Sequence, residues 1–208
     1  SPAFIAELGV SGEPKEPLSG RTMLPAGFGW KDTHGSQCIP MVLAEFLAYK
    51  SALAYEDGPV IEASLGPATG FKFFDTRGRI ADTQGFGFLQ DGMAFIVMRG
   101  SEKVAGDWDV NLNAGVTDLL GDEDGKVVER LAKRRKVGAD HIGEVGKLMT
   151  HLRSFPGTHV GFALAWSAVL DQVNDFLKSV DSRVPVVLSG HSLGGAICSE
   201  TGARLPRS

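Results

Sequence analysis

The sequence has no hydrophobic run long enough to span a membrane and no excess of positive charge. A transmembrane helix needs about 20 consecutive apolar residues, and no apolar stretch of this chain approaches that length. The formal net charge is −4, so no basic field is present to attract the phosphates of a nucleic acid. Both absences argue against a membrane-spanning protein and against a nucleic-acid partner.

Cysteine is also scarce. The two cysteines, Cys38 and Cys198, lie far apart in the chain. Two thiols do not make a disulfide framework, so we expect two buried, unpaired thiols. No signal peptide is recognisable, yet the sequence begins at Ser1 without a methionine, which is compatible with a targeting segment that has been removed. The compartment is therefore left open.

Glycine, by contrast, is abundant. The 208 residues include 27 glycines, roughly twice the usual share of about 7%. This suits a fold with many tight turns between strands and helices. The length is enough for one sizeable domain. We expect residues 1–36 to form an irregular N-terminal arm and residues 37–208 to form the domain, with neither a metal nor a cofactor.

The first element of the domain is expected to be a helix over 37–55. Its apolar residues recur at helical spacing along one face: Val42, Phe46, Tyr49 and Leu53. Gly58-Pro59 is expected to end this helix.

Three strands are predicted next, over 70–76, 83–90 and 93–98. Asp91-Gly92 separates the last two and is a strong hairpin signal. The run Ala94–Met98 is continuously apolar, which predicts a strand that is covered on both faces.

The chain from 102 to 157 is the least regular part. It contains an acidic patch that is followed closely by a basic run of Arg130, Lys133, Arg134, Arg135 and Lys136. Such a run could attract anionic lipid head groups. A solvated helix face neutralised by its acidic neighbours is the favoured alternative.

Regular structure is expected again near the C-terminal end. A long helix running to about Ser182 is indicated by one apolar stripe, which contains Phe162, Trp166, Val169, Val173, Phe176, Leu177 and Val180. An apolar strand over 184–188, a tight turn over 190–195 and a further helix from Ala196 complete the pattern. A helix, a buried strand and another helix in this order are typical of a parallel α/β sheet.

The tight turn reads Gly190-His191-Ser192-Leu193-Gly194-Gly195. Gly-x-Ser-x-Gly alone is a weak signal, but here it follows an apolar strand and opens a helix, as a nucleophile elbow must. Gly190 and Gly194 lack the Cβ atoms that would collide where strand and helix approach. The sequence therefore predicts Ser192 as a catalytic nucleophile.

The helix that follows the turn would favour negative charge at its N-terminus. The backbone N–H of Leu193 is therefore the expected oxyanion-hole donor. His191 is adjacent to Ser192, and neighbouring side chains on such a turn point in different directions. We accordingly expect His191 to pack or orient the elbow rather than act as the base.

Several separated motifs resemble one family, the class 3 lipases, which include the secreted fungal triacylglycerol lipases. The first is Val97-Met98-Arg99-Gly100-Ser101 with the following Asp107-Trp108 and Asn111-Leu112. The others are Thr158-His159-Val160-Gly161-Phe162 and the run from Gly190 to Ala196. They occur in the family's order over about 70–196. The resemblance implies an α/β-hydrolase fold with a predominantly parallel sheet flanked by helices.

The resemblance also implies roles for residues outside the elbow. Ser101 would be the second oxyanion donor, and Trp108 would lie near the start of a lid within a long insertion at about 103–156. His159 looks structural. A secreted or translocated protein is favoured over a cytoplasmic one by this resemblance only.

A serine nucleophile needs a base and an orienting acid, and α/β-hydrolases carry them after the serine. Residues 193–208 contain neither Asp nor His. In addition, the apolar strand at 184–188 normally lies mid-sheet and would otherwise leave an exposed edge. We therefore expect this chain to be the N-terminal portion of the domain. The triad His and Asp would lie outside residues 1–208, in a C-terminal remainder that could be a separate chain.

The sequence thus predicts a serine carboxylic ester hydrolase of the triacylglycerol lipase or phospholipase A1 type. It would form an acyl-enzyme from acylglycerol or phospholipid esters and contact a membrane or lipid surface transiently. The alternative is a catalytically silent, lipase-like interaction module.

Overall fold

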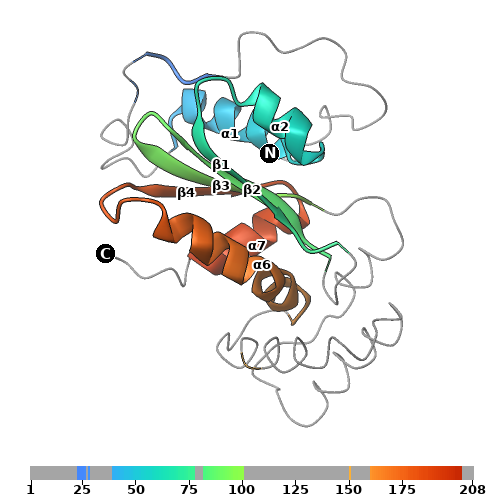
Figure 1. Ribbon diagram of the computed structural model, residues 1–208. Coiled ribbons are helices and arrows are strands. Elements are labelled where there is room, and N and C mark those ends of the chain that lie inside the picture. Colours follow the sequence, from blue (N-terminus) through green and yellow to red (C-terminus); the bar gives the residue numbers. More distant parts are fainter. Residues whose placement is uncertain are drawn as a thin grey trace.

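The computed structural model describes residues 23–26, 28, 39–77, 82–100, 150 and 160–202. These residues form three layers, with one sheet between two pairs of helices (Figure 1). Nearly all of the predicted N-terminal arm, 1–36, and of the predicted lid region, 103–156, lies outside the described residues.

The sheet has four described strands, β1 (Thr69–Asp75), β2 (Gln84–Gln90), β3 (Met93–Met98) and β4 (Val186–Gly190), in the order β1-β2-β3-β4. β1 pairs with β2, and β2 with β3, in antiparallel fashion, whereas β3 and β4 are parallel. The expectation of a predominantly parallel sheet is therefore not confirmed by the described strands. β1, β2 and β3 follow one another at sequence distances too short for the crossover connection that a parallel pair needs.

The hairpin between β2 and β3 is confirmed. Asp91 and Gly92 both have positive φ, 51° and 73°. Two central residues of positive φ define a type I′ turn, whose twist matches that of the strands it joins.

The central strand β3 is buried along its whole length, as its apolar run predicts. Successive side chains of a strand point to opposite faces. Ala94, Ile96 and Met98 pack with the two helices of one face, and Met93, Phe95 and Val97 pack on the other face.

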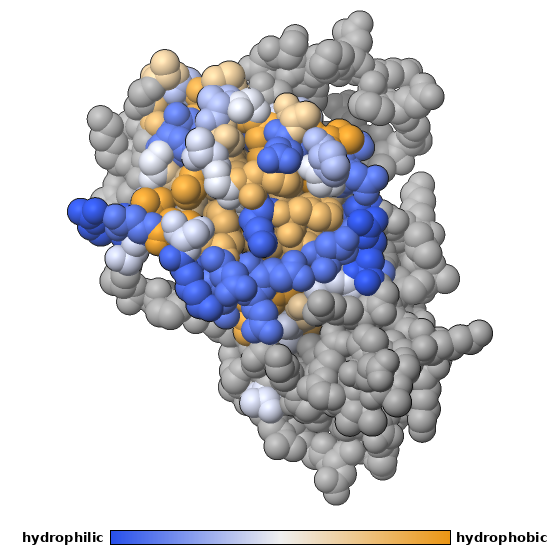
Figure 2. Space-filling view, in the orientation of Figure 1, coloured by the Kyte–Doolittle hydropathy of each residue, from blue (hydrophilic) through white to orange (hydrophobic). Residues whose placement is uncertain are grey.

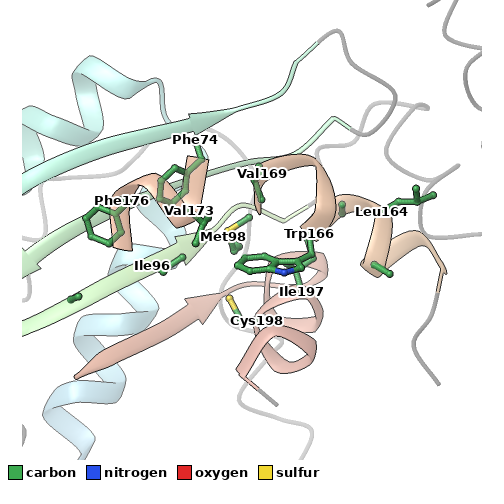
Figure 3. Packing of buried hydrophobic residues seen from close by; sticks show 13 residues of the cluster. Phe74, Ile96, Met98, Leu164, Trp166, Val169, Val173, Phe176, Ile197 and Cys198 are labelled. Atoms are coloured by element: carbon green, nitrogen blue, oxygen red, sulfur yellow. The ribbon is translucent and has the colours of Figure 1, made fainter. Parts of the chain in front are cut away.

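One face of the sheet is covered by α6 (Val160–Lys178) and α7 (Leu193–Gly202). Figure 3 shows the aromatic and branched side chains that fill the space between them and the sheet. The predicted apolar stripe of α6 is confirmed: Trp166, Val169, Val173 and Phe176 are buried, and Phe162 and Leu177 are half-buried. The helix was expected to run to about Ser182 but ends at Lys178, so Val180, also half-buried, lies beyond it. The α6 side chains that are exposed are all polar and lie in the C-terminal half of the helix: Asp171, Asn174, Asp175 and Lys178. A band of hydrophilic residues crosses the face of the molecule shown in Figure 2.

Two helices, α1 (Met41–Leu53) and α2 (Gly58–Ser64), cover the other face. Phe46 and Leu53 of α1 are buried as predicted, but Val42 is 40% exposed, so its placement on the buried face was wrong. Gly58-Pro59 does follow the first helix, but its main role is to open a second one. Proline is favoured in the first turn of a helix, where its missing N–H costs nothing, and it occupies that position in α2.

The expected boundaries near the elbow shift slightly. The strand predicted over 184–188 runs over Val186–Gly190, and the helix predicted from Ala196 begins at Leu193. β4 forms one edge of the described sheet, and all five of its residues are half-buried. Within the described ranges, no helix is long and apolar enough to cross a membrane.

Candidate functional site

The candidate site lies where β3 and β4 end. The two strands are parallel neighbours, with Met98 opposite Gly190. The turns that follow them therefore leave the sheet at the same edge, which is where ligands bind in open α/β sheets. Arg99-Gly100 continues from β3, and His191-Ser192 continues from β4.

Ser192 occupies the turn between β4 and α7. Its φ is +54°, in the left-handed region that residues with a side chain seldom adopt. Its carbonyl oxygen accepts a hydrogen bond from the N–H of Ala196 at 3.1 Å, so Ser192 stands at the start of α7. The side chain is exposed. This is the strained strand-to-helix geometry that a nucleophile elbow requires.

Two glycines allow the elbow to lie against the end of β3. A Cβ on Gly194 would overlap the carbonyl oxygen of Met98 and lie 2.9 Å from the carbonyl oxygen of Arg99. A Cβ on Gly190 would lie 2.8 Å from the same Met98 oxygen and 2.6 Å from the carbonyl oxygen of Gly194. Both positions leave no room for a larger residue, as the motif predicts.

The first turn of α7 faces the same edge of the sheet. The first N–H groups of a helix have no partner inside it and carry the positive end of its dipole. The Gly194 N–H bonds to the carbonyl oxygen of His191 at 2.9 Å. The N–H of Leu193, directly after Ser192, belongs to the same turn. The elbow therefore provides a local environment that favours negative charge next to the serine.

The exposed imidazole of His191 points back to the first helix layer. Its Nδ1 and the phenol oxygen of Tyr55 are 3.0 Å apart and form a hydrogen bond. The two rings lie 6.1 Å apart, centroid to centroid. Tyr55 also lies under Arg99, whose guanidinium carbon is 5.5 Å from the centre of the phenol ring.

Arg99 is held from its other side by β2. Its Nη1 donates a hydrogen bond to Oε1 of Gln84 at 2.6 Å, and its backbone N–H donates to the Gln84 carbonyl at 2.9 Å. The Gln84 amide in turn donates to Asp75 at 3.4 Å. Burial of the Asp75 carboxylate acts to raise its pKa, but hydrogen bonds with Arg77 lower the pKa by more. The net result is an Asp75 pKa below the usual value.

Beneath the elbow, Ser189 joins β4 to α1 and α7. Its Oγ is hydrogen-bonded to Oγ of Ser51 at 2.8 Å. Its carbonyl accepts a hydrogen bond from Sγ of Cys198 at 3.0 Å. Burial raises the pKa of the Cys198 thiol to about 12. Cys198 is free and buried, as expected.

Several predicted residues cannot be placed. The second expected oxyanion donor, Ser101, and the candidate lid residue, Trp108, lie outside the described residues. His159, Cys38 and the basic run over 130–136 also lie outside the described residues. Within the ranges that the structure describes, no group of three His, Cys, Asp or Glu side chains could hold a metal ion.

Tyr55 ends the predicted first helix, but no functional role was predicted for it. Nothing in the sequence near Tyr55 indicates its contact with His191, because the spacing of apolar residues does not reveal which side chain reaches the elbow. The contact with His191 spans 136 positions of sequence and becomes visible only in the folded chain.

Two comparisons with known proteins bear on the family of this chain. A search of curated proteins found no match. The family model described as Lipase (class 3) matches residues 95–206, more than half of the chain. The matched segment begins in β3 and runs through α7, so it contains both turns of the candidate site. The family match does not favour the catalytically silent alternative. The chain therefore belongs to the class 3 lipases, a family of lipid-degrading ester hydrolases with the α/β-hydrolase fold.

Proposed function

We propose that Ser192 is the nucleophile of ester hydrolysis. Its Oγ attacks the ester carbonyl, the alcohol leaves, and the acyl group is held on Ser192 until water releases it as a carboxylic acid. Backbone N–H groups of Leu193 and Ser101 bind the oxyanion. One such donor typically contributes about 2.7–4 kcal/mol of transition-state stabilisation.

The observation that carries this proposal is the positive φ of Ser192, +54°. A left-handed conformation costs a residue with a side chain roughly 1–2 kcal/mol, and such strain is concentrated at functional sites. Here the strained residue is an exposed serine at the start of a helix. A turn with a purely structural role would carry glycine at this position at lower cost.

The base that activates Ser192 is expected outside the described residues. His191 is the one histidine that they contain, and its Nδ1 is engaged by Tyr55. The proposal therefore keeps His191 as an orienting residue of the elbow. A histidine held by an acid would accept the serine proton and pass it to the leaving alcohol.

The proposed substrates are acylglycerol or phospholipid esters, with transient contact to a lipid surface and with Trp108 near the start of a lid. A panel of triacylglycerol, monoacylglycerol, phospholipid and short aryl esters would separate a triacylglycerol lipase from a phospholipase A1. Release of fatty acid from the sn-1 position of a phospholipid would indicate the latter.

Fluorophosphonate labelling of the full-length protein tests the nucleophile. These probes react with an activated serine, so we expect one adduct, on the peptide that contains Ser192, and no adduct in Ser192→Ala. The matched control is Ser199→Ala, which removes an exposed hydroxyl from the same helix and should label normally. A folded wild-type protein without an adduct on Ser192 would contradict the proposal.

A further inference from the structure

We infer that Tyr55 is a positioning residue that holds the Arg99-Gly100 turn and the His191-Ser192 turn at a fixed separation. This inference rests on the proposed ester hydrolysis at Ser192. Tyr55 lies just beyond α1, whose last residue is Leu53, and its phenol reaches the ends of both β3 and β4.

The first contact fixes the elbow. The phenol oxygen of Tyr55 and Nδ1 of His191 lie 3.0 Å apart. His191 directly precedes Ser192, and its carbonyl oxygen accepts the hydrogen bond of the Gly194 N–H. A shift of the imidazole would therefore be transmitted to the backbone that sets the direction of Ser192 and of the Leu193 N–H.

The second contact fixes the turn after β3. A Cβ on Gly100 would overlap the phenol oxygen of Tyr55 and lie 2.6 Å from the carbonyl oxygen of His191. Gly100 is thus packed between the Tyr55 hydroxyl and the elbow backbone. The residue bonded to Gly100 is Ser101, the second proposed oxyanion donor.

The third contact holds the phenol ring itself. The Arg99 guanidinium carbon lies 5.5 Å from the ring centre, a cation–π distance. Arg99 is in turn bonded to Gln84 by its side chain and its backbone. The ring of Tyr55 is therefore supported by the strand layer, while its hydroxyl touches both turns.

The consequence is catalytic, because one proposed oxyanion donor, Leu193, belongs to the elbow, and the other, Ser101, follows Gly100 directly in the sequence. Oxyanion donors act at 2.7–3.1 Å from the developing charge, and a misplacement of about 1 Å can reduce the rate about 100-fold. A side chain that touches both turns determines whether both donors reach one oxygen. The donors contribute more in the transition state than in the ground state, so loss of their alignment lowers kcat rather than raising KM.

The test is Tyr55→Phe in the full-length protein, which removes the hydroxyl and keeps the ring beneath Arg99. With short p-nitrophenyl esters we expect kcat to fall about tenfold while KM changes less than about twofold. The fluorophosphonate reaction with Ser192 should slow to a similar extent. The melting temperature should remain within a few degrees of the wild-type value, which shows that the variant is folded.

The chain has two tyrosines, so Tyr49→Phe is the matched control. It removes a phenol hydroxyl from α1, the helix that precedes Tyr55, and should leave kcat unchanged. A double-mutant cycle with His191→Ala adds a second readout, because two residues that act through one contact are not additive. Tyr55→Phe should then reduce kcat less than about twofold in the His191→Ala background.

The outcomes separate the two proposals. Wild-type protein that labels at Ser192, with Tyr55→Phe labelling at the same rate and with the same kcat, would overturn the role of Tyr55 alone. So would a fall in melting temperature with unchanged kcat, since a purely structural role predicts that result. Wild-type protein that does not label would overturn the proposed function and this inference together.

Discussion

Gly194 of the elbow lies directly against the carbonyl oxygen of Met98, the last residue of β3. The contact brings the first turn of α7 onto the end of the neighbouring strand. It places Ser192 beside the Arg99-Gly100 turn, and it depends on the absence of a side chain on Gly194. The elbow and the β3 turn are therefore a single packed unit.

Gly194→Ala should disrupt this unit. The new Cβ would meet backbone atoms of Met98 and Arg99, which cannot move aside as a flexible side chain could. Overpacking of this kind costs about 1–3 kcal/mol or more. We expect a lower melting temperature and a large loss of fluorophosphonate labelling. In Gly202→Ala, at the end of the same helix, the nearest atom to the new Cβ would be Leu188 Cδ1 at 3.4 Å. If Gly194→Ala is as stable and as reactive as Gly202→Ala, the packing argument is wrong.

Ser192→Gly should stabilise the fold while abolishing labelling. Glycine adopts a φ of +54° without the steric cost that serine bears there. The gain is partly offset by the greater freedom of glycine in the unfolded chain. We expect the free energy of unfolding in urea to rise by up to about 1 kcal/mol relative to Ser192→Ala, which retains a Cβ and therefore the strain. A glycine variant less stable than the alanine variant would show that the backbone of Ser192 is not strained.

Lys50→Met should also stabilise the fold. Lys50 on α1 is completely buried, with its Nζ 5.0 Å from the ring centre of Phe46 and 5.6 Å from that of Phe88. In the described part of the chain, this Nζ has no hydrogen-bond partner. Burial lowers the Lys50 pKa from 10.5 to about 8. Removal of the amine should raise the free energy of unfolding at pH 7 by on the order of 3 kcal/mol.

The pH dependence of the free energy of unfolding tests whether Lys50 is buried as an amine with a lowered pKa. The folded-state pKa of Lys50 lies below the unfolded value, so folding releases a proton between about pH 8 and 10.5. This group therefore makes the wild-type protein more stable as the pH rises through that window. Urea unfolding at several pH values should show the rise in wild-type protein and in Lys72→Met, whose site is exposed, but not in Lys50→Met. The same slope in all three proteins would refute the assignment to Lys50.

Cys198 should be unreactive in the folded protein. Its thiol is buried, and its pKa is raised to about 12, whereas the reactive species is the thiolate. We expect iodoacetamide at pH 7.5 to modify the Cys198 peptide at least about 100-fold more slowly in buffer than in urea. Mass spectrometry distinguishes this peptide from the one that contains Cys38. Comparable rates in the two conditions would mean that the thiol is accessible.

Short-range features of the fold were predictable from the sequence. The hairpin at Asp91-Gly92 was found because two residues determine its turn type. The burial of β3 followed from its unbroken apolar run. The elbow at Ser192 was found because the strand, the tight turn and the helix are adjacent in the chain. In each case the forces that select the structure act between residues a few positions apart.

Other features depended on which elements become neighbours. Sequence spacing placed Val42 on the buried face of the first helix, but the packing of α1 against the sheet leaves it exposed. Gly58-Pro59 was expected only to end a helix, although proline is equally suited to begin one, and the chain begins α2 there. The hairpin predicted at Asp91-Gly92 already implied that β2 and β3 are antiparallel, but the antiparallel pairing of β1 with β2 was not predicted. The family resemblance had instead implied a predominantly parallel sheet.

The sequence by itself determined the tight turn at Ser192, because the strand, the turn and the helix that define it are adjacent in the chain. Only the tertiary structure decided that Tyr55 reaches His191 and that Lys50 is enclosed by aromatic rings. The first contact joins the turn after α1 to the turn after β4, and the contact of Lys50 with Phe88 joins α1 to β2. Their formation depends on how whole layers pack, a free energy shared among many side chains that is not encoded in any short stretch of sequence.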